Sequence, residues 1–247
     1  MSTNFRNADD ESAQRLRNVR SAIDTACAQA GREPSAVALL AVSKTWPALD
    51  VQRMALAGQR QFGENYIQEG VDKIVAVRDA LQTELPDAVL VWHCIGPIQS
   101  NKTTLVAQHF DWVHSVDRLK IAQRLSDQRP AGMTPLQVCV QVNVDGAQTK
   151  SGVALAEATE LARQVAQMPR LQLRGLMCIP DPRPDGSAPT EAFATAAALY
   201  QSWQDLGLGV DTLSMGMSAD LSEAVAAGST MVRVGTALFG QRTYAAS

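Results

Sequence analysis

Runs of apolar residues alternate with amphipathic stretches along almost the whole chain. Between residues 10 and 30, apolar side chains recur at steps of three and four residues, and Gly31 follows them. This spacing predicts a first helix that ends near the glycine. From residue 37 onward, short apolar runs without polar alternation are typical of strands that are covered on both faces. Eight such runs occur, at residues 37–42, 61–63, 89–95, 112–116, 136–144, 173–179, 212–217 and 231–234.

Each predicted strand except the last precedes a helical stretch, and no linker rich in proline or serine divides the chain. Strands that alternate with helices form parallel sheets. Eight such units in about 210 residues fit a (β/α)8 TIM barrel, whereas open doubly wound sheets usually have fewer strands. We therefore predict a single α/β domain over residues 1–247, with an extra N-terminal helix at 10–30 and the barrel at 36–240. An open α/β sheet is the alternative.

Composition and charge narrow the function classes. The 247 residues include 22 Lys and Arg against 25 Asp and Glu, a net charge of -3, and 5% are aromatic. Proteins built around a nucleic-acid backbone need clustered positive charge and usually stacking aromatics, so we expect no nucleic-acid partner. No apolar run approaches the roughly 18 residues of a membrane span, and the amino terminus shows no secretory signal. We expect a cytoplasmic protein without a membrane partner.

The cysteines and histidines suggest structural roles. The four cysteines contain no CxxC pair, and three of them fall in predicted strands, which favours buried reduced thiols. The three histidines, His93, His109 and His114, lack metal-ligand spacing, so no metal site is predicted. Each is expected to be a hydrogen-bonded core residue, with His93 and His114 lining the same barrel.

Lys44 is the first candidate for chemistry. It follows the strand at 37–42 and precedes a helix, which places it at the carboxyl end of a barrel strand, where active sites of this fold lie. Desolvation among partly buried neighbours lowers the pKa of a lysine and makes its amine available as a nucleophile. The alternative is a lysine that merely extends from a strand end into water.

Two candidate anion sites lie in the carboxyl-terminal part of the chain. Ser218 is expected to open a helix over 219–227, so its hydroxyl and the helix amides would face a phosphate. Gly235 and Thr236 follow the last strand, where close backbone approach to an anion favours glycine. The alternative for Ser218 is a simple helix cap, with Asp220 in the first turn. Together with Lys44, these turns predict a site that binds a phosphorylated aldehyde and holds it as a Schiff base.

Five ordered motifs carry a resemblance that covers about residues 10–244. They are AVSKT at 41–45, FGENYIQEG at 62–70, WHCIGPIQSNK at 92–102, RGLMCIP at 174–180 and LSMGMSADLSEAVAAGSTMVRVGTALFG at 213–240. The chain resembles the pyridoxal 5'-phosphate (PLP) homeostasis protein family, whose eukaryotic members are called proline synthetase co-transcribed homologues. That family is similar to the barrel domain of alanine racemase and of other fold-type III PLP proteins, without their second β domain.

The resemblance implies that PLP is the cofactor and assigns it a set of residues. Lys44 matches the lysine that forms the Schiff base, and Asn65 matches a polar residue near the cofactor ring. Arg233 matches the arginine that faces the pyridine nitrogen. Because arginine stays protonated and can only donate, the ring nitrogen would remain unprotonated and the ring would be a weaker electron sink. That disfavours transamination and suits racemase-like proton transfer or storage of the cofactor. A surface ion pair is the alternative for Arg233.

The phosphate end and one departure from the family pattern complete the implied site. Ser218, Gly235 and Thr236 match the phosphate cradle, with Ser214 as a neighbour. Relatives commonly carry a second lysine two residues after the first, and this chain has Trp46 there; Lys150 is the other candidate for such a lysine.

The proline-rich segment 180–189 lies above the predicted barrel mouth, either as a lid or as an ordinary surface loop.

These observations predict a cytoplasmic PLP-binding protein that holds the cofactor on Lys44, with no catalytic residues and no turnover. Racemisation in this fold uses a second base, supplied in alanine racemase by the partner's β domain, and the chain leaves no room for that domain. The same absence favours a monomer, and apo PLP-dependent enzymes are the expected recipients. The alternatives are a fold-type III racemase or lyase acting on an amino acid, and a cofactor-free class I aldolase in which Lys44 attacks a sugar phosphate.

Overall fold

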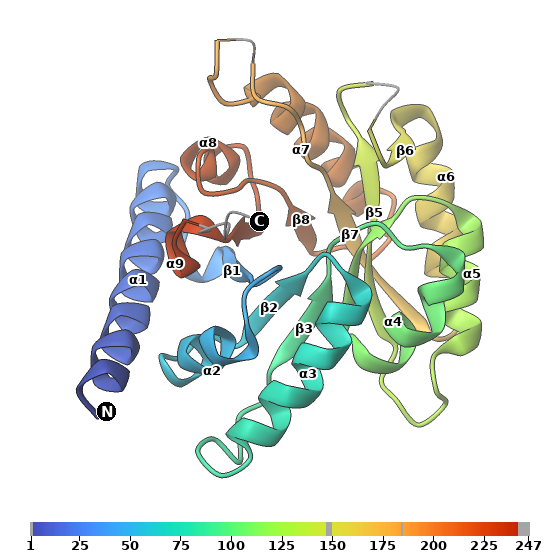
Figure 1. Cartoon of the computed structure of the whole chain (residues 1–247). Coiled ribbons are helices and arrows are strands. Elements are labelled where there is room, and N and C mark those ends of the chain that lie inside the picture. Colours follow the sequence, from blue (N-terminus) through green and yellow to red (C-terminus); the bar gives the residue numbers. More distant parts are fainter. Residues whose placement is uncertain (1, 147–149, 184, 242–247) are drawn as a thin grey trace.

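Eight parallel strands form a barrel that helices surround (Figure 1). The computed structural model describes residues 2–146, 150–183 and 185–241. The barrel strands are β1 (Ala38–Val42), β2 (Gln61–Glu64), β3 (Val91–Cys94), β4 (Trp112–Val116), β5 (Leu136–Asn143), β7 (Leu171–Met177), β8 (Thr212–Ser214) and β9 (Met231–Val234). Their order is β4-β3-β2-β1-β9-β8-β7-β5, and β4 also pairs with β5, which closes the barrel. The predicted (β/α)8 barrel is confirmed, and the open-sheet alternative is wrong.

Both faces of the strands are covered, which explains their continuous apolar sequences. Leu40, Ile95 and Met231 form a small buried cluster, which is separate from the main core between strands and helices. Gly63 lies against this small cluster, and a Cβ atom there would be 3.1 Å from the Ile95 side chain. A ninth strand, β6 (Val153–Ala154), extends the sheet beside β5 with two residues and was not expected from the sequence.

Helices follow the strands on the outside of the barrel. They are α1 (Ser2–Gln29), α2 (Ala48–Leu56), α3 (Ile67–Leu81), α4 (Thr103–His109), α5 (Leu119–Gln128), α6 (Leu155–Ala166), α7 (Thr190–Asp205), α8 (Leu221–Ala226) and α9 (Thr236–Phe239). Two short 3-10 helices, η1 (Pro34–Ala36) and η2 (Ser100–Lys102), complete the set. None of the helices in the described ranges is long and apolar enough to cross a membrane.

The first helix takes a place in the outer helical layer. Leu16, Val19, Ile23 and Cys27 are buried, as the predicted apolar stripe requires. These four residues belong to the main core. Helix α1 contacts α2, α8 and α9 (Figure 1). Since α9 has only four residues, α1 covers the region that a full eighth helix would occupy. The helix begins eight residues before the predicted start at residue 10.

The start of helix α8 differs from the prediction because local capping signals compete. Helix α8 begins at Leu221 rather than at residue 219, and Asp220, not Ser218, occupies the N-cap position. The Oδ1 atom of Asp220 accepts a hydrogen bond from the Met217 amide at 2.6 Å, which closes the turn before the helix. Helix α6 begins at Leu155, since β6 occupies the two residues before it.

Candidate functional site

A cavity of about 350 Å³ opens at the carboxyl ends of the barrel strands. This volume lies within the usual range for small-molecule sites, about 300–1,000 Å³. Six of the seven predicted site residues line it together: Lys44, Asn65, Ser218, Arg233, Gly235 and Thr236. The remaining lining residues are Val42, Trp46, Ile95, Ile179, Met217, Ala219 and Gly240.

The seventh predicted residue, Ser214, lies outside the lining. It is fully buried at the end of β8, and its hydroxyl contacts Arg233. The lining residues that were not predicted from the sequence are chiefly apolar: Val42, Ile95, Ile179 and Met217. Each lies at or just after the carboxyl end of a strand, and that position was the signal that could have found them.

Arg233 lies inside the barrel on β9 and is only 5% exposed. Its Nη1 atom donates to the Ser214 hydroxyl at 2.8 Å, and its Nη2 atom donates to the Cys178 carbonyl at 2.9 Å. Burial lowers the pKa of Arg233 from its ordinary value. These contacts rule out a surface ion pair. They hold the guanidinium in one orientation at the cavity wall.

A row of buried polar side chains continues from Arg233 into the barrel. His114 Nδ1 lies 3.1 Å from the Ser214 hydroxyl, and His114 Nε2 lies 2.9 Å from His93 Nδ1. Burial lowers the pKa of His93 to about 3 and the pKa of His114 well below its ordinary value, so both rings are neutral. The prediction of hydrogen-bonded core histidines is confirmed for these two. His109 differs, since it is half-buried on α4.

Asn65 provides a test of whether the cavity fits a polar ligand. Its Oδ1 atom is buried and has no hydrogen-bond partner among the described residues. A buried polar atom without a partner costs free energy, and a ligand donor in the cavity would remove that cost. Gly96 packs so closely on Asn65 that a Cβ atom there would lie 2.1 Å from the Asn65 carbonyl oxygen. The backbone of Asn65 is therefore held in place from the neighbouring β3–α4 loop.

The two turns that were predicted to bind an anion both lie at the cavity. Ser218 lies in the turn between β8 and α8, and Gly216 begins that turn with φ of +91°. Gly235 and Thr236 lie where β9 passes into α9, and a Cβ atom on Gly235 would approach the Val42 carbonyl oxygen to 3.3 Å. A lysine amine, a guanidinium, an unpartnered amide oxygen and two turns that follow strands therefore surround one cavity. These groups fit PLP, which carries an aldehyde, a ring nitrogen, a phenolic oxygen and a phosphate.

Trp46 and Lys150 show what stands in place of the second lysine. Trp46 lines the cavity and stacks on Phe239 of α9, with 5.8 Å between ring centroids. Lys150 lies outside the lining and forms ion pairs with Asp145 and, at 3.0 Å, with Asp181. Hydrogen bonds to these carboxylates raise the pKa of Lys150 against the opposing effect of burial. Its amine thus joins the loop after β5 to the loop after β7.

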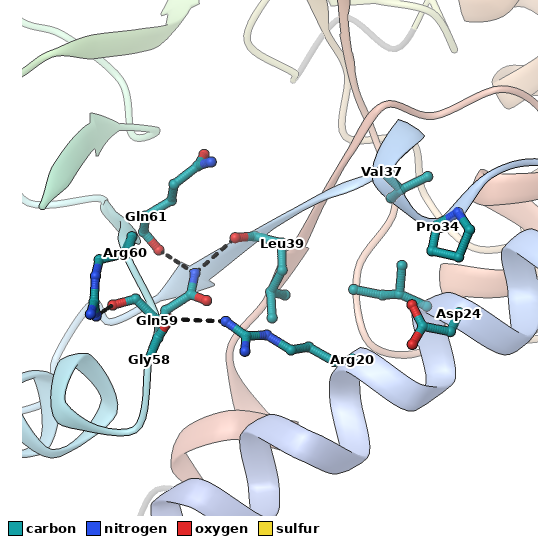
Figure 2. Close-up of a pocket in the computed structure, with 10 residues that line it drawn as sticks. Arg20, Asp24, Pro34, Val37, Leu39, Gly58, Gln59, Arg60 and Gln61 are labelled. Carbon is teal, nitrogen blue, oxygen red and sulfur yellow. Dashed lines mark hydrogen bonds between the residues drawn. The ribbon is translucent and has the colours of Figure 1, made fainter. Parts of the chain in front are cut away.

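A second cavity, of about 340 Å³, lies at the opposite end of the barrel between α1 and the starts of β1 and β2 (Figure 2). Several of its polar side chains donate hydrogen bonds to backbone carbonyls. Gln59 Nε2 donates to Leu39 and Gln61, both at 2.8 Å, and Arg20 Nη2 donates to Gly58 at 2.9 Å. Polar groups at this end of a barrel serve stability, and the contact of Arg20 attaches α1 to the barrel.

Comparison with known proteins identifies the family. The chain is 55% identical to the pyridoxal phosphate homeostasis protein of Pseudomonas aeruginosa over 234 residues, which cover 95% of this chain and 97% of that protein. The chain belongs to the pyridoxal phosphate homeostasis protein family. The family model for the alanine racemase N-terminal domain matches residues 14–243. The resemblance carried by the five motifs is therefore confirmed.

Solved structures agree with this family. PipY of Synechococcus elongatus, determined with PLP bound, is 37% identical, with a TM-score of 0.77 and coverage of 93% of this chain and 100% of that one. Alanine racemase from Corynebacterium glutamicum is 15% identical, with a TM-score of 0.64, and therefore shares the fold. The match covers 94% of this chain and only 61% of the racemase chain.

Proposed function

We propose that this protein holds PLP as a Schiff base on Lys44 and contributes to PLP (vitamin B6) homeostasis without turning over a substrate. The observation that carries the proposal is the convergence of Lys44, Asn65, Arg233 and the two anion turns on one cavity. The names of the family's relatives and the PLP-bound structure of PipY support it. In this proposal the whole chain, residues 1–247, is one cofactor-binding domain.

Bound PLP would supply a reactive aldehyde and an electron-withdrawing ring. Lys44 would hold the group as a Schiff base between its amine and the aldehyde carbon, which forms with loss of one water molecule. Arg233 would donate to the ring nitrogen and could not accept a proton from it, which would keep that nitrogen unprotonated. Asn65 offers its unpartnered amide oxygen near the ring. Ser218, Gly235 and Thr236 would hold the phosphate with hydroxyl and backbone N–H donors.

The lining of the cavity supports a holding role rather than turnover. Of the described residues that line it, only Lys44 and Arg233 carry charge, and none is a histidine, a tyrosine or a carboxylate. Racemisation by two bases needs a second proton-transfer group on the opposite face of the cofactor. Tyr66, the tyrosine nearest in sequence to a barrel strand end, is 58% exposed and is not in the lining. A racemase or lyase remains the second candidate, and the shared barrel is what favours it.

Absorbance spectroscopy tests the proposal. The purified protein with added PLP should show a visible band that borohydride abolishes, leaving the reduced adduct on Lys44 by peptide mass spectrometry. Lys44→Ala should lose the band, and the control Lys120→Ala, on the exposed side of α5, should keep it. A protein that gains no band would overturn the proposal. Turnover of alanine or serine well above the rate of unbound PLP would instead support the racemase or lyase.

Delivery, location and oligomeric state are further parts of the proposal. We expect the recipients to be apo PLP-dependent enzymes, the location to be the cytoplasm, and the protein to be a monomer. The four cysteines are all free and buried, which is compatible with a reducing compartment. Activation of an apo enzyme by the PLP-loaded protein, in the presence of a phosphatase that destroys released PLP, tests delivery. Light scattering on the eluting protein tests the monomer.

A further inference from the structure

Lys44 lies between two backbone groups that are held from the same side. The carbonyl of Ser43, just before it, accepts a hydrogen bond from Lys73 Nζ at 2.8 Å. The amide of Thr45, just after it, donates to Glu69 Oε1 at 2.6 Å. Lys73 and Glu69 both belong to α3, on the outer side of the barrel wall. The chain is therefore tethered on each side of the lysine.

The two tethers are joined in one cluster, formed by the buried Glu64 and Lys73 and the partly exposed Glu69. Lys73 Nζ contacts Glu64 Oε1 at 2.7 Å and Glu69 Oε1 at 3.0 Å, so its three donors serve two carboxylates and the Ser43 carbonyl. The Ser43 hydroxyl also donates to Glu64 Oε1, at 2.6 Å. Glu64 is fully buried and Lys73 is 4% exposed. Because all of these groups share contacts, a change in one moves the others.

Thr45 gives a reason for the tethers. Its φ is +67°, and it is the one non-glycine residue with a positive φ in the part of the chain that the structure describes. A β-branched residue is strongly disfavoured in this left-handed conformation and stays there only where its surroundings hold it. The side chain of Thr45 is exposed, so it adds little packing. The Trp46 amide donates to the Ser43 carbonyl at 3.1 Å and closes the turn around Thr45, and the hydrogen bond to Glu69 is the side-chain contact that holds the conformation.

The cluster is costly as a device for stability alone. It buries the Glu64 carboxylate with the Lys73 ammonium, and the Oε2 atom of Glu64 has no partner among the described residues. Burial raises the pKa of Glu64 despite the neighbouring Lys73. Buried ion pairs are often no more stabilising than apolar residues of similar volume, whereas they fix geometry through directional bonds. The arrangement therefore favours a role in orientation.

We propose that Glu64, Glu69 and Lys73 are positioning residues that aim the Lys44 side chain into the cavity by holding Thr45 in its left-handed conformation. This inference rests on the proposed function. Without the cluster, Thr45 returns to a negative φ and the Lys44–Thr45 peptide rotates. The amine then departs from the position in which it attaches to the aldehyde, while the rest of the cavity, on β2, β8 and β9, is unchanged. The predicted signature is a loss of covalent attachment with non-covalent binding preserved.

Two ligands separate these effects. PLP reports on attachment to Lys44, whereas pyridoxine 5'-phosphate lacks the aldehyde and reports on the cavity alone. Glu69→Ala should weaken PLP binding about tenfold, because a small displacement of a reacting group lowers its reactivity by that order. The same variant should leave the Kd for pyridoxine 5'-phosphate within about twofold. Glu69→Gln keeps an acceptor for the Thr45 amide and should retain most of the PLP affinity. The matched control Asp72→Ala, on the exposed side of α3, should change neither ligand.

The double variant Glu69→Ala with Thr45→Gly is the decisive arm. Glycine adopts a positive φ without steric cost, so it should restore much of the PLP affinity that Glu69→Ala removes. The inference is overturned if Glu69→Ala weakens both ligands equally, if it lowers only thermal stability, or if glycine at residue 45 gives no recovery.

Failure of the proposed function would look different. A wild-type protein that forms no Schiff base overturns the proposed function. Hydrogen exchange at the Thr45 amide then tests separately whether the cluster holds the backbone at Thr45. The amide should be protected in the wild type and exchange at least about tenfold faster in Glu69→Ala. Equal exchange rates in the two proteins would refute the positioning role.

Discussion

The guanidinium of Arg233 donates a hydrogen bond to the hydroxyl of Ser214, with 2.8 Å between Nη1 and Oγ. Since arginine can only donate, Ser214 accepts and turns its own proton toward His114 Nδ1, 3.1 Å away. His114 then carries its proton on Nε2 and donates to His93 Nδ1. This direction leaves one buried group without a partner among the described residues, the N–H of His93 Nε2. The opposite direction would leave two, the Ser214 hydroxyl proton and the lone pair of His93.

Ser214→Ala should therefore affect both stability and the site. The variant leaves a buried Arg233 donor and a buried His114 nitrogen unpaired, at a cost of about 1–3 kcal/mol in the free energy of unfolding. We expect weaker PLP binding as well, because the guanidinium loses one of its two fixed contacts. Urea unfolding and PLP titration measure the two effects. Ser222→Ala, on the exposed side of α8, is the control and should change neither.

The neutral histidines predict a loss of stability in acid. The pKa of His93 is about 3 in the folded protein and near 6.5 when unfolded, so below pH 6.5 the unfolded chain binds more protons. The contribution of His93 is fully present above pH 6.5 and is lost as pH falls toward 3, by up to about 1.4 kcal/mol per pH unit. Unfolding experiments between pH 4 and 8 should show a smaller slope for His93→Phe. Parallel curves for the two proteins would contradict this account.

Arg233→Lys tests the need for a planar donor. An ammonium group does not reproduce the fork that reaches Ser214 and the Cys178 carbonyl together. Loss of one buried, charge-assisted bond should raise the Kd for PLP by roughly ten- to a hundredfold, which corresponds to about 1.5–3 kcal/mol. The visible band should also shift if the guanidinium faces the ring nitrogen. Arg163→Lys, on the exposed side of α6, is the control. Equal PLP affinities of the two variants would refute the need for a planar donor at residue 233.

Gly96→Ala should displace Asn65. The added Cβ atom would lie 2.1 Å from the Asn65 carbonyl oxygen, so one of the two backbone segments must move. We expect a loss of at least about 2 kcal/mol in the free energy of unfolding, with weaker PLP binding. Gly132→Ala is a matched substitution with no atom within 4 Å of the new Cβ, and it should be nearly neutral. Equal stability of the two variants would contradict the close packing.

The barrel and most of its mouth could be predicted from the sequence because position carries the information. Parallel strands covered on both faces appear as continuous apolar runs, and the residue after such a run lies at the mouth. Lys44 and Gly235 were identified in this way, and Arg233 through the family motifs. The Ser218 turn was placed correctly at the cavity, whereas the helix start was wrong, because Ser218 and Asp220 give similar capping signals.

The supporting contacts could not be predicted, because they depend on packing between elements. Lys73 lies in a helix among charged residues, a pattern typical of a solvated face, and only the approach of α3 to β2 buries it against Glu64. Ser214 likewise has no local signal that distinguishes a phosphate neighbour from a partner of Arg233. Thr45 carries no sequence mark of its left-handed backbone, since glycine or asparagine would be expected there.

Pairing of the first strand with the last has a consequence for how the site comes into being. The register joins Leu40 to Arg233 and Ala41 to Val234, so Lys44 and the residues of the anion turn meet across the seam of the barrel. A growing chain has its lysine long before it has the arginine, and the cavity is complete only when synthesis has reached the last strand. A ligand that touches both sides of the seam and binds only the folded state stabilises the closed barrel by RT ln(1 + L/Kd), where L is the free ligand concentration. Cofactor retention is thus a property of the finished molecule and of no shorter fragment that lacks β9.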